Sequence, residues 1–311
     1  MVTLKDIASA CKVSVATVSR ILNEDQSLKV TPQVKEHVFE AALRLGYVPK
    51  RQRKSLRHQV GFIAAPIAKA GYEEAFFERL GRLSARFDVG IEAYHDELSV
   101  DGLILLGDFS ASELAHFSTI TDHLLLINSN AADYRHDRII MDYRNAEEQV
   151  LDYFVGLGID DIGYFGGIHR TDTGIIGERR FQYFTQLLKE RGLLREENIR
   201  IGTMDSMSGY HLTMSAPHLP QAILIGDCSF AEGALRALAE RESGAVVVVY
   251  QDMEEAIFSY HYPHSVLQIF SDAVFETACK LLIERIRGER NTVYSISVPA
   301  TLIHHMQGEV V

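Results

Sequence analysis

The sequence predicts an α/β protein in which a small helical head at the N-terminus precedes two lobes of doubly wound parallel sheet. Three observations lead to this prediction. Residues 1–60 show helical periodicity and an excess of positive charge, the remainder alternates short apolar runs with helical stretches, and 311 residues suffice for two or three globular units. With 47% hydrophobic and 23% charged residues, the chain can bury a large core.

A first short helix is expected after Thr3, which is a suitable N-cap residue. The apolar residues that follow recur at i, i+3, i+4 and i+7, and this spacing places them on one helix face. They are Leu4, Ile7, Ala8 and Cys11. The helix is therefore expected to end near Cys11 or Lys12.

A second helix follows a tight turn and begins after Ser14, another N-cap residue. Its apolar stripe is formed by Val15, Val18 and Leu22. The remaining surface carries Ala16, Thr17, Ser19, Arg20 and Asn23. Two short helices joined this tightly cross steeply, as in the helix-turn-helix that places its second helix in the major groove of DNA. A small amphipathic hairpin with no role in DNA binding is the alternative.

The strings Thr3–Ala8 and Val13–Asn23 resemble the N-terminus of the LacI/GalR family of transcriptional regulators. The resemblance continues through Thr31-Pro32, a cap followed by proline at the first helical position, and through a third helix. It implies a helix-turn-helix DNA-binding domain, a hinge and an effector-binding core similar to periplasmic binding proteins. These parts are expected at residues 1–49, 50–58 and 59–311.

Carried over by position, the resemblance implies that Val15, Ala16 and Arg20 face the bases. Apolar side chains offer contact with a thymine methyl group. The polar residues around them become phosphate-binding or helix-capping groups. The complete set of expected DNA-binding residues is Thr3, Ser14, Val15, Ala16, Thr17, Ser19, Arg20, Asn23, Arg53 and Leu56.

The basic stretch at residues 50–57 matches the family's hinge helix, which folds when a dimer sits on its operator. The residue that matches Leu56 wedges into the minor groove and kinks the DNA. Family members usually have Asn and Ala where this chain has Lys50 and Arg53, and the extra cations favour phosphate contact. A solvated tether between domains is the alternative interpretation of this charge run.

Charge divides the chain in the way this organisation requires. Residues 1–60 contain eleven Lys or Arg and five Asp or Glu, about +6, whereas the remaining residues contain 20 and 37, about −17. Cations at one end favour phosphate contact there, and an acidic body limits nonspecific adhesion elsewhere. The pattern is typical of a DNA-binding head on an acidic sensor.

Several classes of protein are disfavoured. No apolar run approaches the ~20 residues that span a bilayer, and the N-terminus lacks a signal-peptide pattern, so the protein is expected in the cytoplasm, away from membranes. Cys11, Cys228 and Cys279 show no CxxC spacing, which favours reduced thiols over a disulfide or a metal site. No P-loop, GxSxG or HExxH motif is present. We therefore expect no enzyme activity, no cofactor and no metal.

Beyond residue 59 the chain alternates strands and helices. Apolar runs typical of buried strands occupy residues 60–65, 90–94, 102–106, 123–127 and 138–141, and then 161–165, 222–225 and 245–250. Helical stretches lie between them at 146–157, 179–191 and 230–241. This rhythm is that of right-handed βαβ units around parallel sheets.

The resemblance implies that the chain crosses between two lobes three times, near Gly158, Gln268 and Asn291. The first lobe then comprises about 59–158 and 268–290, and the second about 159–267 and 291–308. A helix over residues 272–287 would return to the first lobe.

Ligands of parallel sheets bind outside the carboxyl ends of the strands, and between two lobes this position is the cleft. Arg180 matches the family's arginine that holds a pair of sugar hydroxyls or a carboxylate. Asn128, Asp227 and Gln251 follow other strands, and their amide and carboxylate groups suit a polyol. Tyr72 sits where an aromatic ring can stack on a sugar face. The alternatives are loop capping for the strand-end residues and core packing for Tyr72.

Two strand ends depart from the family pattern. Relatives commonly carry Asn-Asp or Ser-Asp where this chain has Asp227-Cys228, and Asp-Asp where it has Gln251-Asp252. These changes move or remove carboxylates around the pocket. The link over residues 95–101 is also too short for the usual helix. In this link and in the amide at Gln251, the chain is similar to repressors of β-galactoside use such as the evolved β-galactosidase repressor.

The sequence thus predicts a sequence-specific DNA-binding transcriptional regulator. It is expected to be a dimeric repressor that binds a pseudo-palindromic double-stranded operator and responds to a saccharide or a sugar derivative in the cleft. The alternatives are a transcriptional activator and a solute- or sugar-binding protein with a vestigial DNA-binding head. The latter would need a secretion signal or catalytic carboxylates at the cleft, and neither is evident.

Overall fold

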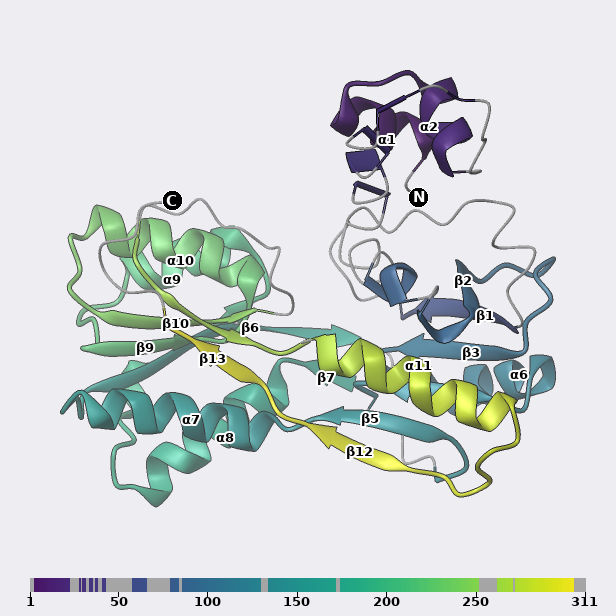
Figure 1. Cartoon of the computed structure of the whole chain (residues 1–311). Helices are drawn as coiled ribbons and strands as arrows, with labels where there is room; N and C mark the ends of the chain where they lie inside the picture. The colour runs from purple at the N-terminus through teal and green to yellow at the C-terminus, as the bar shows by residue number, and fades with distance from the viewer. Residues whose placement is uncertain are drawn as a thin grey trace. The chain divides into compact units, whose positions relative to one another are not determined.

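The structure is a computed structural model (Figure 1). The residues that it describes are 3–22, 28, 30, 31, 34, 35, 37, 38, 41, 42, 58–65, 79–83, 86–129, 134–171, 174–251, 262–270 and 272–304. Contacts divide the chain into two compact units. The first is Met1–Ile140 with Asp272–Ile296, and the second is Met141–Ser271 with Ser297–Val311.

The N-terminal head contains the helices α1 (Leu4–Cys11) and α2 (Val15–Leu22). Each helix buries one face, and in α1 this face contains the expected Ile7 and Ala8. The core that they share with the helical residues further along consists of Ile7, Ala8, Val18, Ile21, Val38, Ala41 and Ala42.

The sheet of the first unit is built from β1 (His58–Ala64), β2 (Val89–Ala93), β3 (Gly102–Leu106), β4 (Leu124–Ile127), β5 (Asp137–Met141) and β12 (Ser295–Val298). Their order across the sheet is β12, β5, β4, β3, β1, β2. The pairs from β2 to β5 are parallel. The link between β2 and β3 contains a turn and no helix, as its length predicts.

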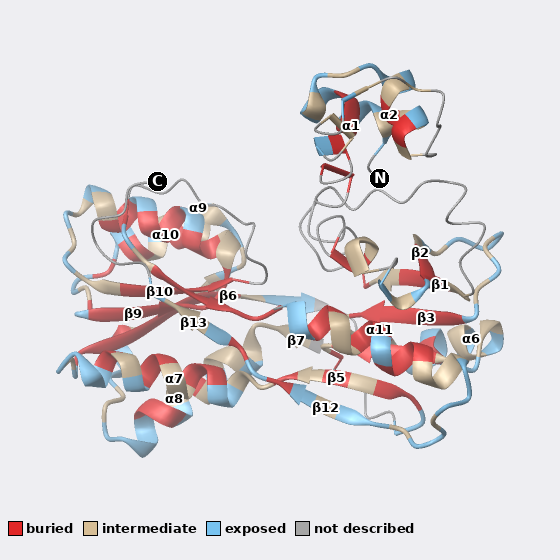
Figure 2. Ribbon diagram, viewed as in Figure 1, coloured by how far each residue is buried: buried red, intermediate tan, exposed pale blue. Residues whose placement is uncertain are grey.

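Helices cover both faces of this sheet, and for this reason β3 and β4 are buried at every position (Figure 2). On one face, Leu103 and Leu105 share a core with Leu114 of α6 (Ala111–Ile120). On the other face, a side chain at Gly102 would meet Leu282 of α11 (Asp272–Ile286) at 3.1 Å. Successive strand residues point to opposite faces, so α6 and α11 lie on opposite sides of the sheet.

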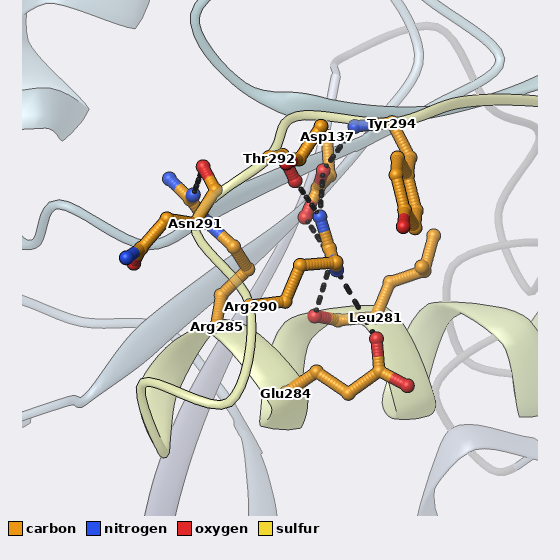
Figure 3. A network of polar contacts seen from close by, with 8 residues as sticks. All are labelled: Asp137, Leu281, Glu284, Arg285, Arg290, Asn291, Thr292 and Tyr294. Atoms are coloured by element: carbon orange, nitrogen blue, oxygen red, sulfur yellow. Dashed lines mark hydrogen bonds and ion pairs between the residues drawn. The ribbon is translucent and has the colours of Figure 1, made fainter.

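A network of polar contacts fixes the segment that follows α11 (Figure 3). The Arg290 guanidinium forms two parallel bonds to the Asp137 carboxylate, at 2.9 and 2.7 Å, and its Nε lies 3.1 Å from Glu284. It also donates to the Leu281 carbonyl at 3.0 Å, while the Tyr294 amide donates to Asp137 at 2.7 Å. Asp137 begins β5, so the network ties α11 and the approach to β12 to the neighbouring strand.

The second unit contains β6 (Ile162–Thr171), β7 (Gly174–Ile176), β8 (Ile199–Thr203), β9 (Ala222–Ile225), β10 (Val246–Gln251), β11 (Ser265–Gln268) and β13 (Thr301–Ile303). Their order is β13, β11, β10, β9, β6, β7, and β8 pairs with β6. The pairs from β8 through β6, β9 and β10 to β11 are parallel. In contrast, β7 and β13 are antiparallel to their neighbours.

Two pairs of helices cover the second sheet (Figure 1). α7 (Tyr143–Gly156) and α8 (Glu178–Glu190) lie on one face, and α9 (Ser206–Met214) and α10 (Cys228–Glu240) lie on the other. The core beneath α10 includes Phe165, Ile223, Ile225, Phe230, Leu235, Val247 and Val249.

Strand residues of the opposite parity face α7 and α8. They include Tyr164, whose ring centroid lies 6.0 Å from the rings of Phe181 and Phe184 on α8. Tyr250 follows the same alternation on β10. Its ring centroid lies 6.0 Å from that of Tyr143 on α7.

The unit boundaries differ from those expected near Gly158, Gln268 and Asn291. α7 groups with the second unit, and two ion pairs also tie it to the end of α8. These pairs are Arg144–Glu190 at 2.9 Å and Asp152–Arg191 at 2.6 Å. The later boundaries fall after Ser271 and Ile296. α11 belongs to the first unit.

The strands and helices expected from apolar runs are present with small shifts at their ends, except that β6 continues to Thr171, beyond the expected residue 165. β3 and β9 have the expected limits, whereas α7 begins at Tyr143, before the expected residue 146. α6, α9, β7, β8 and the last three strands lie outside the expected segments. In the described part of the chain, none of the helices combines the length and the apolar character needed to cross a membrane.

Candidate functional site

The first helix of the head is capped by side chains. The Thr3 amide and hydroxyl each donate to the Asp6 carboxylate at 2.7 Å. These hydrogen bonds lower the pKa of Asp6 and hold its charge at the helix N-terminus, where a negative charge is favourable. Thr3 therefore acts as the expected cap, and its contact with DNA stays a prediction.

A tight turn sets the start of α2. Lys12 adopts a left-handed conformation with φ 54°, and the Val13 amide donates to the Ala8 carbonyl at 3.1 Å. Ser14 then caps α2, because its Oγ accepts from the Thr17 amide at 3.0 Å and lies 2.8 Å from the Thr17 hydroxyl. The local geometry is that of two short helices joined by a helix-turn-helix link.

The surface of α2 presents the expected base-reading residues. Val15 is 40% exposed, and Ala16 and Arg20 are also exposed. The buried stripe differs from the expected one, since Val18 and Ile21 are buried while Val15 points outward. Thr17 and Ser19 are partly buried beside them. The helix α2 is thus anchored by buried residues on one face, and its first turn is exposed on the other face.

Three expected DNA-binding residues fall outside the described part of the chain. They are Asn23, Arg53 and Leu56. The expected hinge at residues 50–58 lies outside it as well, apart from its last residue. Their roles stay predictions that follow from the resemblance.

In the second unit, Arg180 lies near the carboxyl ends of the strands. It belongs to the first turn of α8, which begins after Gly177 with φ 84°. Its Nη1 donates to the Gly226 carbonyl at 2.7 Å, directly after β9. Its guanidinium carbon lies 4.8 Å from the centroid of the Tyr250 ring on β10. Two strand ends therefore hold the arginine expected to bind the effector.

Asp227 is both near Arg180 and committed to capping. It is the N-cap of α10, and its Oδ1 accepts from the Phe230 amide at 2.8 Å. Its Oδ2 accepts from the Gly167 amide at 2.9 Å, which joins β6 to the end of β9. Burial raises the pKa of Asp227, while the Arg180 charge and these amides lower it. The loop-capping alternative thus describes its contacts, and an additional role in ligand binding stays a prediction.

The other expected ligand residues belong to other parts of the chain. Gln251 ends β10 and is 4% exposed, and its carbonyl accepts from the Ile269 amide at 3.0 Å. Asn128 follows β4 in the first unit, with φ 54°. Tyr72 lies outside the described residues.

Two further side chains near Arg180 were not predicted from the sequence. Glu147 of α7 is fully buried, and Tyr164 of β6 is 1% exposed. A Cβ at Gly226 would lie 2.0 Å from the Tyr164 hydroxyl, so this hydroxyl occupies the space beside the carbonyl that binds Arg180. A signal for Glu147 exists in the sequence, since it shares a helix face with Val150 at i+3.

Burial dominates the electrostatics of Glu147. It raises the pKa of the carboxyl well above the ordinary value, and the Arg180 charge offsets only part of this shift. Burial also raises the pKa of the Tyr164 hydroxyl. We name Glu147, Tyr164, Arg180 and Asp227 the buried polar cluster. It combines one permanent cation, two carboxyl groups and a hydroxyl near the strand ends, a set able to donate to and accept from a polyol.

The fold and these sites define a helix-turn-helix transcriptional regulator with a core like that of periplasmic binding proteins. Residues 3–50 match the family model of bacterial regulatory proteins, lacI family, and residues 151–305 match the periplasmic binding protein-like domain. The chain is 30% identical to the HTH-type transcriptional repressor MelR of Bacillus subtilis (strain 168), over 97% of this chain and 96% of that protein. The chain belongs to the lacI family of DNA-binding transcriptional regulators.

Other relatives and solved structures agree with this assignment. The HTH-type transcriptional regulator GalR of Lacticaseibacillus casei is 28% identical, with 97% of this chain and 98% of that protein covered. The lac repressor dimer bound to operator and the anti-inducer ONPF has the same fold, with a TM-score of 0.64, 20% identity and 97% coverage of each chain. A complex of the regulator CelR with cellobiose gives a TM-score of 0.63 at 20% identity, with 97% of this chain and 98% of that chain covered.

Proposed function

We propose that this chain is a cytoplasmic repressor that binds a pseudo-palindromic DNA operator as a homodimer. The N-terminal turn of α2 carries the proposal. Ser14 caps this turn and Val15 is exposed at its front, while Val18 and Ile21 anchor the helix from behind. A turn held in this way is able to enter a major groove and contact base edges. The name of the relative MelR, a transcriptional repressor, supports repression as the direction of control.

The effector that we propose is a saccharide bound beside Arg180 at the strand ends of the second unit. The planar guanidinium suits a pair of hydroxyl groups, and the Tyr250 ring beneath it fixes its orientation. The cellobiose complex of CelR, which shares this fold, supports a sugar as the class of ligand.

Control then follows from linkage. The saccharide changes operator occupancy only if it binds the operator-competent and operator-incompetent states of the dimer with different affinities. A coupling of ~1–3 kcal/mol corresponds to roughly a 5- to 150-fold change in operator affinity. The chain needs no chemical reaction for this role, and the family to which it belongs is one of regulators.

Selection from a library of palindromic duplexes tests DNA recognition. At moderate salt, one half-site should be enriched, and Val15→Asp should weaken binding to it at least about tenfold, because a carboxylate would face phosphates and bases. Val155→Asp is the matched control, since Val155 is an equally exposed valine on α7 in the other unit. Equal enrichment of all sequences would contradict the proposal.

Titration of the bound operator with cellobiose, lactose and melibiose tests the effector site. Arg180→Ala should abolish the response and leave operator binding without sugar unchanged. Arg179→Ala is the control, because the neighbouring Arg179 is exposed. A normal response in Arg180→Ala would contradict the site.

A further inference from the structure

Several polar side chains of the second unit are buried without a hydrogen-bond partner among the described residues, and two of them lie near Arg180. Both carboxyl oxygens of Glu147 and the hydroxyl of Tyr164 are in this state. Buried polar groups in folded proteins are nearly always paired, and leaving one unpaired is unfavourable. A phenylalanine and an apolar residue would avoid both losses at these positions. Two such groups in one place therefore indicate a partner that the chain itself does not supply.

The two groups belong to the same small region. The Tyr164 hydroxyl is close enough to Arg180, Glu147 and Asp227 for each charge to shift its pKa. A Cβ added at Gly226 would lie only 2.0 Å from the same hydroxyl oxygen. Gly226 is also the residue whose carbonyl accepts the hydrogen bond from Arg180. Arg180 is also the charged group that acts on Glu147. The unpaired groups thus lie near the arginine of the proposed effector site and are more deeply buried than it is.

Charge in this region is nearly balanced. Burial raises the pKa of Asp227, while the Arg180 charge and two backbone N–H bonds offset part of this rise and favour its ionised form. Burial favours the neutral form of Glu147. An anionic ligand would then gain little from a cation that is already compensated, and it would lose its hydration. A neutral hydroxyl is able both to donate to and to accept from a carboxylic acid and a phenol.

We propose that Glu147 and Tyr164 form a hydroxyl-binding subsite near Arg180, and that this subsite makes the regulator selective for a neutral saccharide over a sugar phosphate or a uronate. The proposal rests on the saccharide effector proposed above and adds the class of sugar and two specificity-determining residues. Both side chains are buried in the structure, and the proposal therefore requires that they become accessible when the sugar binds.

Calorimetric titration of the full-length protein tests the subsite. The neutral probes are cellobiose, lactose and melibiose, and the charged probes are galacturonate and lactose 6-phosphate. The wild type should bind a neutral probe at least about 100-fold more tightly than either charged probe, because a compensated site leaves a buried anion unpaired. Tyr164→Phe and Glu147→Leu should each weaken neutral binding about tenfold or more, whereas Glu147→Gln, which is neutral and similar in shape, should stay within about threefold of wild type.

Thr213→Val is the matched control. The Thr213 hydroxyl is also buried and unpaired among the described residues, but it lies on α9, on the opposite face of the sheet. Its loss should leave sugar binding unchanged. Operator binding without sugar shows whether each variant is folded. If Glu147→Leu fails to fold, Tyr164→Phe tests the subsite alone, because this substitution removes one unpaired oxygen and keeps the ring.

Each outcome supports or contradicts the subsite. Wild-type affinity in Tyr164→Phe overturns it, and so does tighter binding of a charged probe. If Arg180→Ala abolishes sugar binding while Tyr164→Phe does not change it, the effector site stands and the subsite falls. If the wild type binds none of the neutral probes, the saccharide effector and the subsite fall together.

Discussion

At the scale of single residues, Glu147 makes the stability of the second unit depend on pH. Burial raises the pKa of its carboxyl well above the ordinary value of 4.5. The folded protein therefore keeps this proton at pH values where the unfolded chain has released it. The protonated Glu147 carboxyl makes its full contribution to the free energy of unfolding below the pKa of the unfolded chain. This contribution is lost as the pH rises toward the pKa of the folded protein, by up to about 1.4 kcal/mol per pH unit.

Glu147→Gln removes this titration. The stability of the variant relative to wild type should therefore increase between about pH 5 and pH 8, because only the wild type loses stability through this group. Urea unfolding at several pH values measures the difference. Glu148→Gln, at the next position of α7, controls for the loss of an acidic residue on this helix. A difference between Glu147→Gln and wild type that stays constant with pH would contradict the buried neutral carboxyl.

A glycine is required at position 226 because of the neighbouring Tyr164 side chain, and not because of its own backbone conformation. Its added Cβ would lie 2.0 Å from the Tyr164 hydroxyl oxygen and 2.6 Å from the ring carbon that bears it. Gly226→Ala should destabilise the protein by about 1–3 kcal/mol through overpacking. In Gly226→Ala/Tyr164→Leu the clash is absent, so thermal or urea unfolding should show a smaller loss than the sum of the two single variants. Strict additivity would contradict this origin of the strain.

The site was partly accessible from sequence at this scale. Strand-end position and family resemblance predicted that Arg180 and Asp227 belong to one site, and the structure places both beside Gly226. Glu147 was missed because an acidic residue in a helix is most often on its solvated face. Its burial depends on the packing of α7 on the second sheet, which the expected boundary near Gly158 assigned to the other lobe.

At the scale of elements, apolar runs predicted the central strands well. β3 and β9 are buried on both faces and have continuous apolar sequences, so their limits follow from composition. β12 and β13 are short and mostly not buried, and they give no comparable signal. The helix α9 is also hard to foresee, because it contacts α10 through small residues rather than through a broad apolar stripe.

The contact between α9 and α10 depends on two glycines. A Cβ at Gly233 would lie 1.7 Å from the Ser206 carbonyl, and one at Gly209 would lie 2.0 Å from the Phe230 carbonyl. Backbone atoms cannot move aside as a flexible side chain does. The glycines therefore set how closely the two helices approach.

Gly233→Ala tests this contact. We expect a loss of about 1–3 kcal/mol in the free energy of unfolding, with α9 displaced. Gly244→Ala is the matched control, because a Cβ there meets no atom within 4 Å. Denaturant unfolding compares the two variants, and equal stabilities would contradict the close approach.

At the scale of the whole molecule, charge distinguishes the DNA-binding head from the rest of the chain. The first 60 residues carry about +6 and the remaining residues about −17. Operator binding should therefore weaken steeply with salt, since each phosphate neutralised contributes about −0.9 to the slope of log K against log salt. Sugar binding beside a compensated arginine should depend little on salt. Sequence alone predicted this division, because it needs only the positions of the charged residues.

The central claim is that operator and sugar are linked through one protein. Reciprocal titration tests it most directly: operator affinity with and without a saturating neutral disaccharide, and sugar affinity with and without saturating operator. Both affinities should change by the same factor, roughly 5- to 150-fold, and Arg180→Ala should bring both factors to one. Tight operator binding that no concentration of a bound sugar alters would contradict the account.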